Sequence, residues 1–463
     1  MKIKEHDEQL VGKVVLEGTL KLDAPLLIGD GGSTMSAARA KDIHVLRNDK
    51  GRAFIPGTSL IGVLRDLFSR QSQNLVTEIF GNLEDMQSTI QAGDIIFSKS
   101  ETIFRDGVHI DEYKGSAVHG EKYDYEAIER GAEAPLRIVF TLRGCHLGDG
   151  TGHIRNEILD GIRFLRDRLE SGIHLGAHTS KGLGRAHLLD STLGCYDFHN
   201  PKDVLAWLGA DEPAASAASI QLSGKGAMPI EASDTFSVSA EFALSSSLLI
   251  REYQTDKNGK QIAAMKHSRE AAVIPGSSLK GVLRHRAARI LRELGHNPEM
   301  LDGLMGCSNS EEKGSGEMTE GRIKSRFIVE ESYLEEHQDQ LREPVVTRNR
   351  IDRFTGGVIG NALLNTRPVY QKDSSTGTVK IRFSIRQASE PEAGLALFLL
   401  KDLWQGDLAL GGETGIGRGR LKGLRAKIQY QQDTFILTGN GRIADGNASV
   451  LERYAAALEK KEG

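Results

Sequence analysis

Cysteine, long apolar runs and proline are scarce in this chain, and the first two scarcities exclude whole classes of protein. The 463 residues include three cysteines, Cys145, Cys195 and Cys307, which lie far apart and form no Cys-x-x-Cys pair. This spacing excludes a disulfide framework and a sequence-local zinc knuckle, and free thiols are typical of a reducing cytoplasm. No run approaches 18 apolar residues, and the first ten residues lack the apolar stretch of a signal peptide. We therefore expect a cytoplasmic protein that does not contact a membrane.

An excess of charge of one sign is also absent. The chain has 59 Lys and Arg residues against 63 Asp and Glu residues, a formal net charge of −4. It is therefore not a basic coat for nucleic acid, and any contact with phosphate must come from local patches. Glycine, in contrast, is abundant: 52 residues, about 11% against a usual ~7%, beside only 11 prolines. Abundant glycine with little proline indicates tight turns and close backbone approaches, not disorder.

The second half of the chain repeats the first. Four landmarks recur in the same order, each between 219 and 241 residues later, which indicates a tandem duplication of one domain. The matched pairs are 25–28 with 247–250, 55–60 with 274–279, 105–111 with 347–352, and 176–188 with 411–421.

The repeat predicts the domain boundaries. We expect a first domain over 1–210, a linker over 211–232 and a second domain over 233–463. The second copy gains residues between the second and third landmarks, and the polar, Gly/Ser-rich stretch 307–321 supplies most of that gain. This composition predicts a mobile insertion.

Each copy begins with the alternating pattern of a β-strand and continues with the apolar spacing of a helix. The order of predicted elements is strand, helix, two strands, helix, strand, which is that of a ferredoxin-like, RRM-like βαββαβ unit. We therefore predict an α+β fold of two such domains in tandem. The clearest segments are the opening strands 14–22 and 236–244, the helices 60–68 and 279–290, the strands 137–142 and 379–385, and the helices 157–169 and 394–404.

A Pro-Gly-Ser/Thr-Ser turn precedes the first helix of each copy. One interpretation is structural: Ser59 and Ser278, or the residues before them, cap the helices. The other is that the exposed N–H groups of a helix start bind phosphate. Basic residues that follow the turns favour phosphate contact, and the candidates are Arg65 in the first copy and Lys280 and Arg284 in the second.

The glycine-rich turns 176–185 and 411–420 carry interleaved cations. They do not fit the GxxxxGK[ST] nucleotide motif, because no Lys-Ser/Thr pair follows the glycines. A tight turn between helix and strand explains the glycines alone, whereas close approach to a sugar-phosphate chain explains the cations as well. The candidate RNA-binding residues here are Lys181, Arg185, Arg418 and Arg420.

Two aspartates follow the opening strands, Asp30 in the first copy and Asp256 in the second. Each is either a turn-forming residue or a carboxylate that positions a 2′-hydroxyl or a hydrated metal near a scissile phosphate. Histidines near the first glycine-rich turn have no counterparts in the second copy, which argues against a zinc site.

These motifs in combination resemble the RAMP superfamily, and specifically the backbone subunits of type III CRISPR–Cas effectors. The resemblance rests on 42–60, on Gly-Leu-Gly-Arg ending at Arg185, and in the second copy on 274–281 and 412–418. Residues 105–111 and 348–353 resemble the family's protruding thumb hairpin, with Val108, Ile110, Ile351 and Arg353 as the thumb residues. A tandem pair in one polypeptide resembles the fused subunits of the type III-D variants.

The resemblance implies a function. Such subunits bind a CRISPR guide RNA along a basic groove, insert thumbs into the guide–target duplex, and contact other type III effector subunits. In many members an Asp on the loop after the first strand cleaves target RNA with a divalent cation, usually Mg²⁺. The resemblance thus assigns catalysis to Asp30 and Asp256, and the metal to Asp30.

Departures from the family pattern keep an alternative open. Glycines follow Asp30 where the family places them before its Asp, and the Asp256 turn has none. The chain could therefore be a non-catalytic RNA-binding scaffold, with cleavage carried out by sister subunits. A stand-alone processing nuclease would use a His general base, and the absence of a repeated His argues against it.

Overall fold

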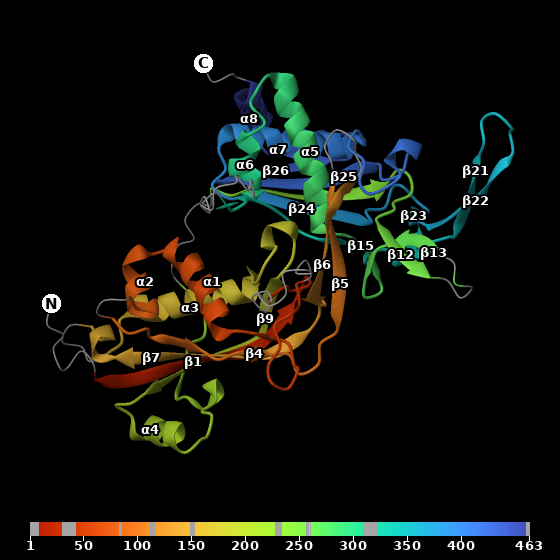
Figure 1. The fold of residues 1–463 in the computed structure, drawn as a ribbon. Helices are drawn as coiled ribbons and strands as arrows, with labels where there is room; N and C mark the ends of the chain where they lie inside the picture. The colour runs from red at the N-terminus through yellow and green to blue at the C-terminus, as the bar shows by residue number, and fades with distance from the viewer. Residues whose placement is uncertain are drawn as a thin grey trace, which may run out of the picture. The chain divides into compact units, whose positions relative to one another are not determined.

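The structure of the protein, a computed structural model, separates the chain into two compact units (Figure 1). The first comprises residues 1–179 and 183–231, and the second comprises 180–182 and 232–463. Each is an antiparallel sheet covered by helices, so the predicted α+β fold of two tandem ferredoxin-like domains is confirmed. The described residues are 9–29, 43–82, 86–110, 117–148, 153–226, 234–255, 259, 261–308 and 322–459.

The central strands of the first unit have the order expected of a βαββαβ unit. The opening strand β1 pairs antiparallel with the last strand on one side and with the third on the other. From one edge to the other, the sheet contains β10 (Ile220–Gln221), β9 (Arg185–Asp197), β1 (Leu10–Leu22), β7 (Glu133–Arg143) and β3 (Ile90–Ala92), with β8 (Ile173–His174) also paired to β9.

Helices α1 (Gly57–Ser69), α2 (Gln73–Phe80) and α3 (Asn156–Ser171) cover one face of this sheet. The predicted alternation of β1 directs its apolar residues into that core, where Phe68 of α1 packs edge-on against Phe164 of α3 at 5.9 Å between ring centroids.

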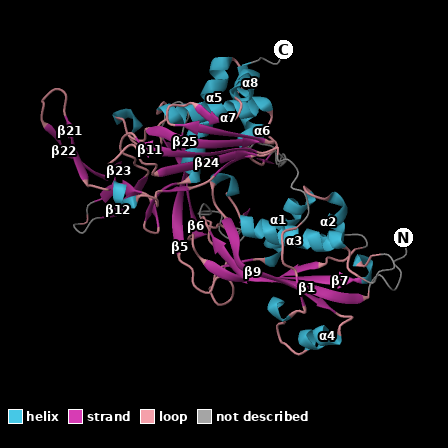
Figure 2. Ribbon diagram, turned by 180° about the vertical axis from the view of Figure 1, so that it is seen from behind, coloured by secondary structure: helices cyan, strands magenta, loops and turns pink. Residues whose placement is uncertain are grey.

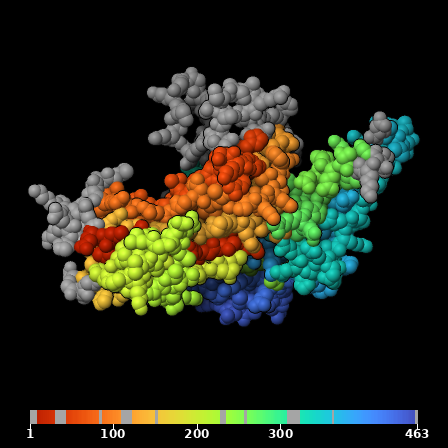
Figure 3. All heavy atoms as spheres, turned by 90° about the horizontal axis from the view of Figure 1, so that it is seen from below, coloured from red at the N-terminus to blue at the C-terminus, as the bar shows by residue number. Residues whose placement is uncertain are grey.

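The opposite face of the sheet carries a second, smaller core. It is formed by Val15 and Tyr196 of the sheet together with α4 (Pro201–Leu208) and the following short helix Ala215–Ala217. Figure 3 shows these yellow-green residues as a surface layer of the first unit.

The second unit has the same central order and a longer edge. Its sheet contains β18 (Phe327–Val329), β24 (Val379–Ile385), β11 (Phe236–Leu244), β25 (Leu421–Tyr430), β26 (Asp433–Thr438) and β27 (Ile443–Asp445). Its helices are α5 (Gly276–Leu294), α6 (Met300–Met305), α7 (Glu390–Gln405) and α8 (Ala448–Glu459). Helix α7 begins four residues before the predicted start, because Ser389 and Glu392 form a capping box.

Hairpins project from both units. In the first unit β5 (Thr102–Ile110) pairs with β6 (Ala117–Ile128). In the second, β21 (Val346–Ile351) pairs with β22 (Val358–Arg367), and Figure 2 shows this hairpin extending from the body of the unit. The strands β12 (Arg251–Thr255) and β13 (Gln261–Met265) join it in one four-stranded sheet. The predicted thumb-like insertions are thus present as hairpins.

Short elements complete the description. Three two-stranded sheets pair β2 (Phe54–Ile55) with β4 (Ile95–Ile96), β16 (Cys307–Ser308) with β17 (Arg322–Ile323), and β20 (Leu341–Arg342) with β23 (Tyr370–Gln371). A three-stranded sheet has β15 (Ala271–Ile274) between β14 (His267–Ser268) and β19 (Ser332–Tyr333). Within the described part of the chain, no helix is both long enough and apolar enough to cross a membrane.

Part of the stretch predicted as a linker, 211–232, is built into the first unit. Strand β10 pairs with β9, and Glu17 of β1 accepts a hydrogen bond from the backbone N–H of Ala215 at 2.9 Å. Composition suggested a linker because the stretch is rich in Ala and Ser, but these small residues pack closely on the sheet.

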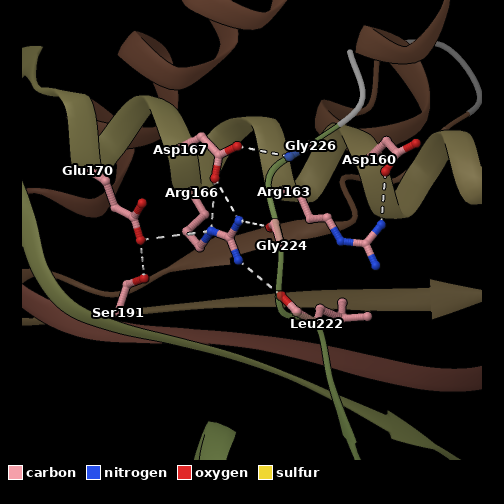
Figure 4. A network of polar contacts seen from close by, with 9 residues as sticks. All are labelled: Asp160, Arg163, Arg166, Asp167, Glu170, Ser191, Leu222, Gly224 and Gly226. Carbon is pink, nitrogen blue, oxygen red and sulfur yellow. Dashed lines mark hydrogen bonds and ion pairs between the residues drawn. The ribbon is translucent and has the colours of Figure 1, made fainter.

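The buried Arg166 of α3 forms hydrogen bonds to the end of the 211–226 stretch (Figure 4). Arg166 donates to the carbonyl oxygens of Leu222, at 3.0 Å, and Gly224, and it also pairs with Asp167. Asp167 in turn accepts from the N–H of Gly226 at 2.9 Å. The first unit therefore includes the residues up to Gly226 and does not end at residue 210.

The predicted serine caps are wrong. Helices α1 and α5 begin at Gly57 and Gly276, with Pro56 and Pro275 at the N-cap positions, and neither has a side-chain cap from its own N-cap residue. In the first unit the carboxylate of Asp94 accepts the N–H of Gly57 at 3.0 Å instead. The predicted mobile insertion, 307–321, lies outside the described residues from 309 onward.

Candidate nucleic-acid interface

In both units the glycine-rich turn is bonded in the same way to the segment that follows the opening strand. In the first unit Ala177 donates its N–H to Leu27 and Gly184 donates to Pro25, both at 2.8 Å. In the second unit Gly412 donates to Leu249 at 2.8 Å, and Gly419 donates to Ser247 at 2.7 Å. The matching bonds show that the sequence repeat is a repeat of three-dimensional structure.

Glycine is required at the centre of these turns. Gly184 and Gly419 have φ of +76° and +80°, and a Cβ added to them would lie 1.8 and 1.9 Å from the carbonyl oxygens of Leu175 and Leu410. The glycines are therefore explained by backbone packing.

The same segment meets the base of the projecting hairpin. Leu26 and Ile128 exchange two backbone hydrogen bonds of 2.8 Å, and Leu248 and Val369 exchange equivalent bonds of 2.8 and 2.9 Å. In each unit, three elements thus converge: the segment after the opening strand, the glycine-rich turn and the base of a hairpin.

The predicted catalytic residues Asp30 and Asp256 lie outside the described residues, but the segments around them are placed. After the Asp30 loop, Ile43 and Glu126 of β6 are joined by a backbone bond of 2.8 Å, and the Glu126 carboxylate accepts the N–H of Val45 at 3.1 Å. Asp256 follows β12, whose neighbour β13 pairs with β22. The Asp30 loop therefore ends beside strand β6 of the first hairpin, and the strand that follows the Asp256 loop pairs with β22 of the second.

The basic residues of α5 are largely used within the fold, which corrects the prediction of a cationic helix start. Lys280 is 7% exposed, and its ammonium group donates to Ser325 at 2.7 Å and to the carbonyl oxygen of Phe327 at 3.0 Å. Arg284 pairs with Asp302 at 2.6 Å and donates to Gly306 at 2.8 Å. These bonds hold the segments on either side of the 307–321 insertion.

The environment of Lys280 also changes its protonation. Burial, and after it neighbouring positive charges, lowers the pKa of its ammonium group to about 7. An ammonium group that is enclosed by protein and bonded to Ser325 and Phe327 is not positioned to contact phosphate.

The cations of the turns differ in accessibility. Arg418 is buried, where it pairs with Glu413 at 2.8 Å and donates to Ser247 at 2.5 Å. Arg420 is exposed and forms no side-chain bond or ion pair to another described residue. In the first glycine-rich turn Lys181 is half-buried, and half-buried Arg185 lies 3.7 Å from Asp23.

The predicted residues at the helix starts remain accessible only in part. Arg65 is exposed without an ion pair among the described residues, Ser59 is exposed, and Ser278 is half-buried.

A shallow pocket in the second unit lies beside the glycine-rich turn, and it is lined in part by Ser245, Tyr370 and Arg418. Across the described residues no three His, Cys, Asp or Glu side chains gather as metal ligands would.

The hairpins present apolar side chains to solvent. Val108 and Ile351 are exposed, as is Arg353, whereas Ile110 is placed by its backbone pairing with Ala117. The sequence interpretation missed Phe354, which is 98% exposed in the β21–β22 turn. An aromatic residue followed by Thr-Gly-Gly in a turn was the available signal.

Comparison with known proteins agrees with this architecture. The chain is 24% identical over 214 residues to the protein named CRISPR system Cms endoribonuclease Csm3 of Methanocaldococcus jannaschii, a match covering 40% of this chain and 82% of that protein. The model of the RAMP superfamily matches twice, over residues 19–187 and 234–422. These two matches cover both units and most of the chain, and the protein therefore belongs to the RAMP superfamily.

Proposed function

We propose that this protein is a CRISPR RNA-binding backbone subunit of a type III effector complex. It holds the guide RNA, its hairpins distort the guide–target duplex, and the loops bearing Asp30 and Asp256 cleave target RNA. The observation that carries the proposal is the convergence, in both units, of the segment that follows the opening strand, a glycine-rich turn and a hairpin base through equivalent backbone bonds. The name of the Methanocaldococcus jannaschii relative, which includes CRISPR and endoribonuclease, supports it.

Exposed cations of the turn and helix motifs supply contacts to RNA phosphates. Arg420 on the second turn and Arg65 on the first helix are exposed. Such contacts position a nucleic acid strand without reading its sequence, which suits a subunit that must bind any guide. The apolar hairpin residues, Ile351 and Phe354 among them, suit contact with bases that have left the stack.

The proposed cleavage depends on holding one nucleotide of the target in a splayed conformation. The 2′-hydroxyl then lies in line with the neighbouring phosphate, which lowers the entropy cost of attack. A divalent cation held at Asp30, Mg²⁺ in the proteins that this chain resembles, would stabilise charge at the phosphate.

The test is cleavage of target RNA by the reconstituted complex that contains Asp30→Ala, Asp256→Ala or both changes. We expect each single change to abolish cuts at its own positions, and the double change to abolish all cuts made by this subunit. Complex assembly and guide retention, measured on the same samples, should be unchanged. Asp211→Ala, an exposed carboxylate of the first unit, is the matched control.

Full cleavage by the double variant would support the scaffold alternative, in which sister subunits cut the target. Loss of guide retention in the double variant would show that the aspartates act in binding or folding instead of catalysis.

A further inference from the structure

Glu413 occupies an unusual backbone conformation in the second glycine-rich turn. Its φ and ψ are 61° and 30°, the left-handed region that non-glycine residues rarely adopt. The corresponding residue of the first turn, His178, has φ of 56°. Both turns therefore place a large side chain where glycine would be less strained, and strain of this kind persists where the side chain has a task.

The side chain of Glu413 binds arginines from three separate elements. It accepts from Arg348 of β21 and from Arg418 of its own turn, the latter at 2.8 Å. Arg251, the first residue of β12, lies 3.6 Å away. One carboxylate thus connects the hairpin, the turn and the strand that leads into the Asp256 loop.

Glu413 remains charged within this cluster. Burial by itself raises the pKa of its carboxyl group, but hydrogen bonds from Arg348 and Arg418 outweigh burial and hold the pKa below its usual value. Three guanidinium groups around one carboxylate leave a positive excess, and Arg251 and Arg348 are partly exposed to solvent. The cluster therefore presents positive charge at the surface where the three elements meet.

The first unit makes a corresponding connection through an aromatic contact. The ring of His178 lies 5.4 Å from the ring of Tyr125, centroid to centroid, and Tyr125 belongs to hairpin strand β6. The position in the turn is shared and the hairpin is contacted in both units, but through its second strand in the first unit and its first strand in the second.

We propose that Glu413 is a positioning residue that locks the β21–β22 hairpin to the glycine-rich turn of the second unit. His178 does the same for β5–β6 by ring contact in the first. The proposal rests on the proposed function, in which the turn and the hairpin contact one RNA strand. When the two elements are locked together, they present a single preorganised surface to the RNA. Binding then avoids the entropy cost of ordering the hairpin against the turn.

The test is hydrogen exchange of the full-length protein without RNA, followed by guide-RNA binding of the same variants. Arg348→Gln removes the hairpin's ion pair and leaves the buried Glu413–Arg418 pair intact, so it is the variant expected to fold normally. Glu413→Gln weakens the whole cluster. We expect both to speed amide exchange in β21 and β22 at least tenfold, with exchange unchanged in the core strands β11 and β24.

Guide-RNA affinity should fall about tenfold in both variants. Arg420→Gln is the matched control: it should weaken RNA binding without altering exchange in the hairpin, because the Arg420 side chain forms no hydrogen bond or ion pair with another described residue. His178→Ala should speed exchange in β5 and β6 only.

Unchanged hairpin exchange in Arg348→Gln would overturn the lock. Faster exchange throughout the second unit would also overturn it, because that result identifies a general stability role. A wild-type protein that retains no guide RNA would contradict the proposed function instead, and the exchange experiment would still decide the lock.

Discussion

At the scale of single residues, burial decides which basic side chains are free to bind an anion. Lys280 and Arg418 belong to motifs that suggest phosphate contact, yet both are enclosed by protein and bonded to it. Arg420, two residues from Arg418, is exposed. Residue type and spacing suggest phosphate contact for all three residues. Only long-range packing distinguishes the two enclosed side chains from the exposed one.

The lowered pKa of Lys280 predicts a dependence of stability on pH. Between the folded pKa of about 7 and the unfolded value of 10.5, the unfolded chain binds more protons at this site, so the free energy of unfolding rises with pH. From pH 7 to pH 9 the expected gain is on the order of 2 kcal/mol. Urea unfolding of the wild type and of Lys280→Met at the two pH values measures it.

Lys280→Met keeps the aliphatic stem and removes the titrating group, so the other ionisable groups contribute equally to both proteins. We expect the variant to lack the gain. An equal gain in both proteins would show that Lys280 is charged and hydrated in the folded state.

At the scale of elements, the glycine-rich turns are defined by backbone contacts that leave no room for a side chain. Gly419→Ala would force a Cβ against the carbonyl group of Leu410, so we expect a loss of roughly 3 kcal/mol or more, with the midpoint of thermal unfolding lowered.

Gly281→Ala is the control for this prediction, because Gly281 lies within α5 and a Cβ there meets nothing within 4 Å. Alanine in a helix is favoured over glycine, so this variant should be more stable by about 0.5–1 kcal/mol. Tolerance of alanine at Gly419 would mean that the turn can relax away from the carbonyl group of Leu410.

Element type was predictable, and element ends were less so. The apolar alternation of β1 and β11 predicted their buried faces correctly, because side-chain direction in a strand follows from sequence position alone. The serine caps failed because Pro and Gly at the helix starts move the cap position three residues earlier than Ser59 and Ser278. The short edge strand β10 was missed because two residues carry no periodic signal.

At the scale of the whole molecule, the place where the chain leaves the first unit has a measurable consequence. A chain split after residue 226 retains β10 and the bonds of Arg166 and Asp167, whereas one split after residue 210 loses them. We expect the 1–226 fragment to unfold at a higher temperature than the 1–210 fragment.

The lower stability of the shorter fragment follows from lost pairing and hydrogen bonding. Arg166 is 8% exposed, and the shorter fragment lacks the carbonyl oxygens of Leu222 and Gly224 that it bonds, although its ion pair with Asp167 remains. Hydrogen bonds to a charged group contribute about 1.5–3 kcal/mol. The variant Arg166→Met in the 1–226 fragment should therefore lose only part of the difference, since β10 would still be present. Equal unfolding midpoints for the two fragments would restore residue 210 as the boundary.

The sequence by itself determined the duplication, the fold class and the family, because periodicity, turn residues and repeated motifs are local properties of the chain. It also placed the hairpins and the glycine-rich turns. The tertiary structure alone decided that Lys280 and Arg418 are internal, that Arg166 holds the end of the first unit, and that Glu413 gathers arginines from three elements. These facts depend on residues distant in sequence that meet in space, and burial and ion pairing arise only when they do.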